Sequence, residues 1–178
     1  MLDPIALLSP TARRRITGAA VVTTAVLTGV LGGIDVPLQN AVAPHGIISF
    51  ELAGTIERSS EILASWDALA RVYAGLSLGL DYVYLLSYST LLALFCSWGA
   101  RRRAGAWHTL GVWLVWGQWG AALMDAVENF GLIRLLLGSS WGGWAVLAAS
   151  AAAVKFALVI LGEGYGIASL LVRPDGGS

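Results

Sequence analysis

The sequence predicts an all-α fold, a four-helix transmembrane bundle with an extracytoplasmic amphipathic segment between its first and second helices. The mean hydropathy is +0.73 and 12% of the 178 residues are charged, whereas about 25% are charged in soluble proteins. Four apolar stretches are each long enough to cross a hydrocarbon core of about 30 Å. We therefore expect a single integral membrane domain that covers residues 1–178.

The first apolar stretch covers residues 16–33 and is rich in Val, Thr and Ala. Arg13, Arg14 and Arg15 precede it, as basic residues precede the apolar core of a signal peptide. No clear A-x-A cleavage site follows, which favours an uncleaved transmembrane helix. Asp35 comes directly after this stretch, where we expect it to form a cap or a turn.

Residues 39–71 are too polar to span a membrane, but they contain two apolar patterns. In the first, Ile47-Ile48-Ser49-Phe50-Glu51-Leu52-Ala53, apolar side chains surround the single carboxylate of Glu51, and Gly54 can end a short helix. In the second, apolar residues recur at helical spacing after Ser59, a favourable N-cap, and predict an amphipathic helix that leads into the next span. We expect this segment to fold back onto the bundle.

The remaining spans are predicted at residues 73–98, 110–137 and 144–172. Arginine residues follow the second and fourth spans, at Arg101 to Arg103 and at Arg173, and others precede the first. With four spans, these arginines all fall on one side, which the positive-inside rule assigns to the cytoplasm. We therefore expect a multi-pass protein of the bacterial inner membrane with both termini in the cytoplasm.

Polar side chains inside the third span indicate a functional site. A carboxylate at the centre of a membrane helix costs about 2.5–3.5 kcal/mol, so it must face protein or water. Asp125, Glu128 and Asn129 lie within one helical arc of about 100°. Gln118, seven residues before Asp125, lies on the same face.

The second and fourth spans carry matching polar residues. Asp81, Tyr84 and Tyr88 share one face of the second span, and Lys155 lies about eleven residues into the fourth. All the charged groups then fall in the outer half or near the middle of the membrane, beneath Glu51. The candidate catalytic residues are Asp125, Glu128, Asp81, Lys155 and Glu51, and the candidate substrate-binding residues are Asn129, Tyr84, Tyr88 and Gln118.

Two interpretations of this cluster remain open. The charges can pair only to hold the bundle together, as buried charges must. However, three or four acids against one lysine leave an excess that must be protonated, hydrated or matched by a ligand. Burial and mutual repulsion favour protonation of at least one acid, which suits general acid/base chemistry.

Other functional classes have less support. The formal net charge is zero, so nothing favours binding to nucleic acid. The two histidines, His45 and His108, fall at opposite ends of the bundle, so we expect no metal site, and no motif indicates a cofactor. An all-carboxylate site for a hard cation stays possible, although Lys155 opposes it.

Several short elements resemble a group of small, uncharacterised bacterial four-helix membrane proteins. They are Gly46-Ile47-Ile48-Ser49-Phe50-Glu51-Leu52-Ala53, Leu80-Asp81-Tyr82, Asp125-x-x-Glu128-Asn129 and Lys155-Phe156. The resemblance implies that the acids, Asn129 and Lys155 belong to one site. It implies no activity.

The leading hypothesis is an intramembrane enzyme that performs acid/base chemistry on an apolar lipid or isoprenoid-like molecule. In it, Asp125 and Glu128 act as acid and base, Asn129 and Tyr84 orient the substrate, and Lys155 stabilises the ionised partner. The alternatives are a proton- or cation-linked carrier or lipid-binding protein, and a structural accessory subunit. The expected partner is a membrane lipid or apolar small molecule, together with a possible second copy of the chain or a partner membrane subunit.

Overall fold

The computed structural model describes residues 2–171, and within this range the chain forms six α-helices, two short 3-10 turns and no strand. This confirms the all-α prediction. Three of the long helices are long and apolar enough to cross a membrane: α1 (Pro10–Asp35) with the turn after it, α4 (Ala68–Arg101) and α6 (Gly143–Leu171). The fourth long helix, α5 (Gly105–Leu136), has 32 residues but falls short in apolarity.

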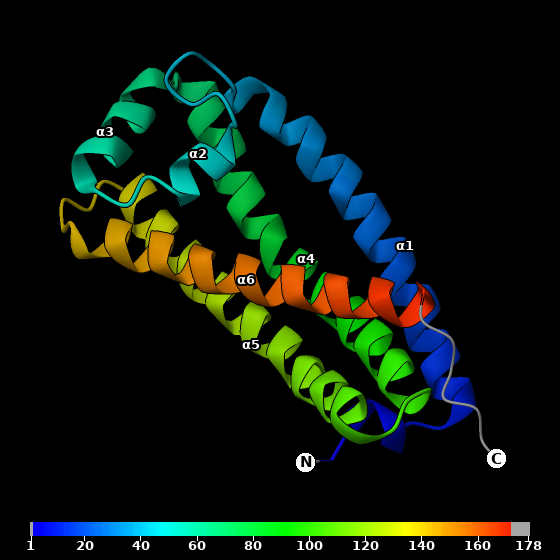
Figure 1. Cartoon of the computed structure of the whole chain (residues 1–178). Coiled ribbons are helices and arrows are strands. Elements are labelled where there is room, and N and C mark those ends of the chain that lie inside the picture. The colour runs from blue at the N-terminus through cyan, green and yellow to red at the C-terminus, as the bar shows by residue number, and fades with distance from the viewer. Residues whose placement is uncertain (1, 172–178) are drawn as a thin grey trace.

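Among the four long helices, α4 contacts α1, α5 and α6, and α5 also contacts α6 (Figure 1). Each long helix begins before the predicted span, and side-chain caps fix this earlier start for α1 and α4. For α1, Ser9 accepts a hydrogen bond from the amide of Ala12, and Pro10 opens the helix. Arg173 and the predicted end of the fourth span lie outside the described residues.

Small residues let α6 approach its neighbours closely. Ala145, Ala148, Ala151 and Ala152 are all buried, and their small side chains permit close approach between helices. At the opposite end of α6, a Cβ added to Gly166 would overlap the ring of Phe95. The packing of α6 therefore depends on the absence of side chains at specific positions.

α1 contacts the rest of the bundle along one side only. Thr24 Oγ1 donates a hydrogen bond to Ser87 Oγ at 3.2 Å, and one turn later Thr28 and Tyr84 share a hydrogen bond of 3.1 Å between their hydroxyls. Only 11% of the most apolar part of this helix is buried. α1 is thus held to α4 by hydroxyl pairs and a narrow line of packing.

The segment between α1 and α4 is anchored by the carboxylate of Asp35. Asp35 Oδ1 accepts a hydrogen bond from the amide of Ile47 at 2.7 Å, and Oδ2 accepts one from Gln39 Nε2 at 2.9 Å. Gly46 has a φ of +55° and its α-carbon lies against this carboxylate, so a side chain would displace it. Asp35 is the last residue of α1 and its side chain does not cap the turn that follows; its carboxylate instead holds the first amide of α2 (Ile47–Glu51), which fixes where α2 begins.

The predicted amphipathic helix begins earlier than expected and does not continue into the next span. α3 covers Ile56–Ser65 and is capped by Thr55, whose side chain accepts a hydrogen bond from the amide of Arg58. Ser59 is therefore not its N-cap; it is buried in the first turns of α3, and its hydroxyl donates to the carbonyl of Thr55. After a break at Trp66, Asp67 caps α4 separately.

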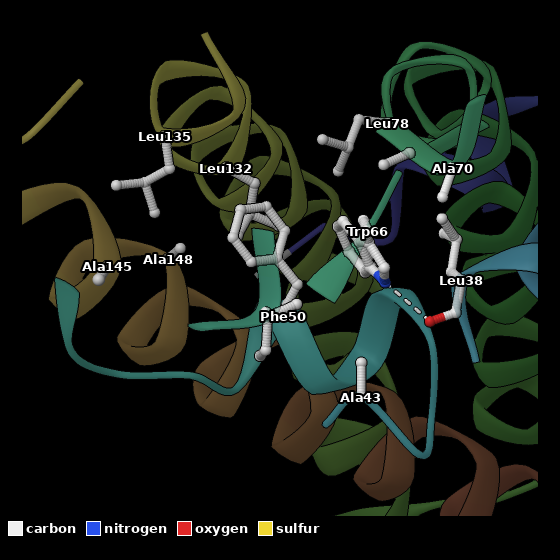
Figure 2. Close-up of a cluster of buried hydrophobic side chains, with 12 residues drawn as sticks. Leu38, Ala43, Phe50, Trp66, Ala70, Leu78, Leu132, Leu135, Ala145 and Ala148 are labelled. Atoms are coloured by element: carbon white, nitrogen blue, oxygen red, sulfur yellow. Dashed lines mark hydrogen bonds between the residues drawn. The ribbon is translucent and has the colours of Figure 1, made fainter. Parts of the chain in front are cut away.

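Side chains of α2 and α3 pack against the ends of the long helices in a buried hydrophobic cluster (Figure 2). Phe50 and Trp66 are both at most 2% exposed and meet edge to face, with ring centroids 5.5 Å apart. Trp66 Nε1 donates a hydrogen bond of 2.8 Å to the carbonyl of Leu38. Because Phe50 packs beside Leu132 and Ala148, the residue after it, Glu51, is held over α5 and α6. This confirms that the segment folds back onto the bundle.

The two ends of the bundle differ in character. Arg13 to Arg15 and Arg101 to Arg103 gather at the end where α1 begins and α4 ends, which we call the arginine end. α2 and α3 lie at the opposite end, beside the start of α6 (Figure 1).

Candidate functional site

Lys155, the only lysine in the sequence, stands at the centre of a group of carboxylates. Its Nζ lies 2.8 Å from Glu128 Oε2, 3.1 Å from Asp125 Oδ1 and 3.7 Å from Glu51 Oε2. Three different helices supply these acids and the lysine, namely α2, α5 and α6. The acid cluster consists of Lys155 and four acids, namely Glu51, Asp125, Glu128 and Asp81 of α4.

Helical spacing explains how α5 presents its share of the cluster. Asp125, Glu128 and Asn129 lie on one face and are at most 2% exposed, although α5 carries exposed apolar residues on its other faces. The predicted arc of three polar residues therefore faces the interior of the bundle.

Glu51 joins the cluster from outside the long helices. Its side chain is 12% exposed and reaches Lys155 from α2. Burial raises the pKa of Glu51 above its ordinary value, and the charge of Lys155 only partly opposes this effect. Glu51 therefore binds a proton more readily in the folded protein than in water.

Hydrogen bonds extend the cluster towards α4. Tyr88 donates its hydroxyl hydrogen to Asp125 Oδ2 at 2.8 Å, so Asp125 accepts from both the tyrosine and the lysine. Asn129 Nδ2 donates to Asp81 Oδ2 at 2.6 Å. Asp125 and Asp81 are thus each oriented by a neutral donor as well as by the field of Lys155.

The cluster contains more acid than base. One ammonium faces four carboxyl groups, and no other cation among residues 2–171 forms an ion pair with any of them. Glu128 is 0% exposed, and its Oε1 has no hydrogen-bond partner in the described part of the chain. A buried, unpartnered carboxylate oxygen is costly, so protons or a cationic group must balance the excess.

A cavity of about 430 Å³ adjoins the cluster, and we call it the lateral cavity. Glu51, Asp81, Asp125 and Lys155 form its polar wall. The rest of its lining comes from α1, α2, α4 and α6: Thr24, Ile48, Tyr84, Tyr88, Leu91, Leu92, Phe156, Val159 and Glu163. Ionisable groups therefore face a space that is bordered mainly by apolar and aromatic side chains.

A second cavity, of about 270 Å³, reaches the same acids from the opposite end of the bundle to the arginines. It shares Glu51, Asp81, Tyr84 and Ile48 with the lateral cavity and extends to Asp35 at the end of α1. The acid cluster thus borders two cavities, one between the long helices and one beneath α2.

The structure brings eight of the nine predicted site residues together. The exception is Gln118, which is 0% exposed and lines neither cavity. Its Nε2 donates a hydrogen bond of 3.0 Å to the carbonyl of Leu158, and its side chain fills the space over Gly162. Gln118 joins α5 to α6 and does not border the site.

Glu128 also differs from its expected setting, because it touches Lys155 but lines neither cavity. Of the predicted acids on the long helices, Asp125 and Asp81 border the lateral cavity. Asn129 lines only the smaller cavity.

Residues of α1 and Glu163 line the lateral cavity but were not among the predicted site residues. Thr24 of α1 borders the lateral cavity, and Glu163 of α6 lies in its lining well away from Lys155 along the helix. The threonines at positions 24 and 28, one helical turn apart, were the available signal in α1. Phe156 is a further lining residue, and its ring centroid lies 4.7 Å from Lys155 Nζ.

No protein-family model, curated protein or solved structure matches this chain. The resemblance to small four-helix membrane proteins therefore stays a prediction. The function is argued below from the geometry of the site.

Proposed function

We propose that α5 is the fourth membrane span and that its low apolarity reflects the functional site. Its polar residues Asp125, Glu128 and Asn129 are buried, whereas Trp113, Trp116, Leu123 and Phe130 are exposed on its outer surface. A helix with an apolar exterior and a polar interior face is stable in a bilayer because lipid contacts only the apolar part. At 1.5 Å per residue, the 32 residues of α5 are ample to cross the membrane.

The four spans are oriented with the arginine end in the cytoplasm, by the positive-inside rule. α2 and α3 then lie on the outer side of a bacterial inner membrane, and α1 begins in the cytoplasm. The acid cluster lies in the outer half of the membrane in this orientation.

The protein functions as an intramembrane acid/base enzyme that acts on an apolar lipid or isoprenoid-like substrate. The observation that carries this proposal is an excess of carboxyl groups over one ammonium, on the wall of a cavity of about 430 Å³ whose other walls are largely apolar. Such a cavity excludes water from an apolar substrate while keeping proton donors and acceptors within reach. The substrate enters from the bilayer along α1, which is mostly exposed.

The residues take distinct roles in this proposal. Asp125 exchanges a proton with the substrate, because it borders the cavity and receives hydrogen bonds from Tyr88 and Lys155. Glu128 holds the second proton behind Lys155, where no solvent reaches it. Tyr84 orients the substrate, and Asn129 orients Asp81.

The proposal is tested with Asp125→Asn and Glu128→Gln in proteoliposomes that contain bacterial lipid extract. We expect both variants to abolish a protein-dependent change in lipid composition, detected by mass spectrometry, while thermal stability is retained. Glu57→Gln is the control because Glu57 is an exposed acid of α3. Unchanged lipid turnover in stable Asp125→Asn and Glu128→Gln would refute the enzyme, and loss of folding would favour purely structural pairing.

A proton-linked carrier is the second candidate, and Glu163 favours it. Glu163 is exposed, lines the lateral cavity and lies eight residues, or about 12 Å, along α6 from Lys155 towards the arginine end. A carrier requires such a titratable group between the cluster and the cytoplasm. Glu163→Gln would then reduce proton flux into vesicles, measured with an internal pH dye, whereas the enzyme reading expects no effect on flux.

A further inference from the structure

A third cavity lies between α1, α4 and α6 near the arginine end and has a volume of about 540 Å³. Leu91 and Leu92 line both this cavity and the lateral cavity, so the two adjoin on the surface of α4. We call the third cavity the inner groove. Its lining is Arg13, Thr17, Leu91, Leu92, Leu94, Phe95, Trp98, Arg101 and Leu170.

The inner groove is apolar along its length and cationic at one end. The only charged side chains in its lining are Arg13 and Arg101. From Arg101 to the leucines shared with the lateral cavity, α4 rises ten residues, or about 15 Å. The groove therefore offers a charged end, an apolar length and an adjoining cavity that holds the acid cluster.

Both arginines retain hydrogen-bonding capacity. Arg13 Nη2 donates to the carbonyls of Ile5 and Leu8 at 3.4 and 3.2 Å, while its Nε is buried without a partner among residues 2–171. Arg101 is exposed and donates through Nε to the carbonyl of Ser97 at 3.3 Å. Each guanidinium has five N–H donors, so the two on Nη1 of Arg13 and the four on Nη1 and Nη2 of Arg101 remain for a ligand.

The local charge favours an anion. In the described chain, six arginines gather at this end together with the carboxylate of Asp3, which already accepts hydrogen bonds from the hydroxyl of Ser97 and the amide of Ile5. Paired arginines bind phosphate oxygens especially well because the planar guanidinium matches their geometry. Trp98 beside them is a residue type that concentrates at the level of lipid headgroups.

We propose that the inner groove binds a membrane lipid with a phosphate head, held between Arg13 and Arg101, whose hydrocarbon chain runs past Leu91 and Leu92 towards the acid cluster. This inference rests on the proposed function, because it names the substrate class of the same site. The lipid enters from the cytoplasmic leaflet, where its phosphate stays at the arginine end. The far part of its chain then reaches the lateral cavity.

The test uses the full chain in neutral detergent, titrated with farnesyl phosphate, with farnesol and with sodium phosphate, and calorimetry measures binding. We expect farnesyl phosphate to bind more tightly than farnesol. Arg101→Gln should weaken binding of farnesyl phosphate at least tenfold, which corresponds to about 1.4 kcal/mol, and leave farnesol unaffected. Arg14→Gln is the matched control, since Arg14 is exposed and does not line the groove.

A second variant tests the apolar part without altering charge. Leu92→Trp fills the junction between the two cavities and should weaken binding of both farnesyl phosphate and farnesol. Thermal unfolding of each variant shows whether a loss of binding reflects a loss of fold. If Arg101→Gln unfolds, Arg101→Lys, which keeps the charge but not the paired donors, should still weaken farnesyl phosphate binding relative to wild type.

Three results would overturn the inference. Equal losses of binding in Arg14→Gln and Arg101→Gln would mean general surface attraction. Equal affinity for farnesyl phosphate and farnesol would remove the role of the phosphate. Displacement by sodium phosphate at the same concentration as farnesyl phosphate would indicate a site for the free anion.

Failure of the proposed function is distinguishable from failure of this inference. The two proposals have separate readouts, which are lipid turnover for Asp125→Asn and Glu128→Gln and binding of farnesyl phosphate for Arg101→Gln. If the acid variants leave lipid turnover unchanged but Arg101→Gln loses binding, the lipid site stands without the acid/base chemistry.

Discussion

Replacing Lys155 with methionine tests whether one ammonium group holds the acid cluster together. The ammonium lies 2.8, 3.1 and 3.7 Å from three carboxyl groups, and its side chain is 9% exposed. Removing one partner of a buried ion pair typically costs about 3–5 kcal/mol, because a buried charge is left uncompensated. We expect Lys155→Met to lower the free energy of unfolding by about that amount at neutral pH.

The measurement is unfolding in mixed detergent and dodecyl sulfate micelles, followed by circular dichroism. Glu61→Gln is the control, because Glu61 pairs with Arg58 at 2.9 Å on the exposed face of α3, where an ion pair contributes less than about 1 kcal/mol. Adding Glu128→Gln to Lys155→Met should restore part of the lost stability, since the acid left without a partner becomes neutral. A loss below about 1 kcal/mol in Lys155→Met would refute the view that this lysine organises the cluster.

Three further predictions concern pH, the anchor of α2 and helix packing. Burial raises the pKa of Glu51 above its ordinary value of 4.5. The contribution of Glu51 to stability is therefore complete below pH 4.5 and declines as the pH rises through the raised pKa. Glu51→Gln should reduce this pH dependence of the thermal midpoint between pH 4 and 8. Asp35→Ala removes the acceptor for the amide that opens α2 and should cost about 1–3 kcal/mol, with faster hydrogen exchange confined to α2 and its flanks; protection equal to wild type would contradict it. Gly166→Ala should destabilise the protein by about 1–3 kcal/mol, because the added Cβ overlaps the ring of Phe95 in α4. Gly164→Ala is the control, because a Cβ there meets nothing within 4 Å. Equal thermal midpoints for the two variants would show that α6 can shift.

Helical phase predicted which residues share a face, but it did not predict how far along the face a site extends. Gln118 has the same phase as Asp125, yet it lies seven residues, or about 10 Å, along α5. At that level the facing element is the backbone of α6 over Gly162, and not a cavity. Asp125 and Lys155 were predicted together correctly because both phase and depth agreed.

The N-terminal end of α3 was also predicted incorrectly. Ser59 was predicted as the N-cap, and this was wrong, because Thr55, four residues earlier, is also a residue type that caps helices. The structure uses Thr55, since burial of Ser59 and Ile62 within α3 places its first turn against the bundle. The placement of Glu51 was easier to foresee, because the large apolar side chain of Phe50 directly before it favours packing against the bundle.

The position of α1 beside the cavity could not be foreseen from pattern. Its apolar residues occur on all sides, so no face stood out, and only the hydroxyls of Thr24 and Thr28 select the side that meets α4. Contacts between distant helices of this kind depend on tertiary packing and not on local propensity.

The order of the cluster residues along the chain has a consequence for synthesis of the protein. All four acids, from Glu51 to Glu128, are translated before Lys155, so the compensating cation enters the membrane last. Until α6 is complete, the four carboxyl groups therefore lack the ammonium group that three of them contact in the folded bundle.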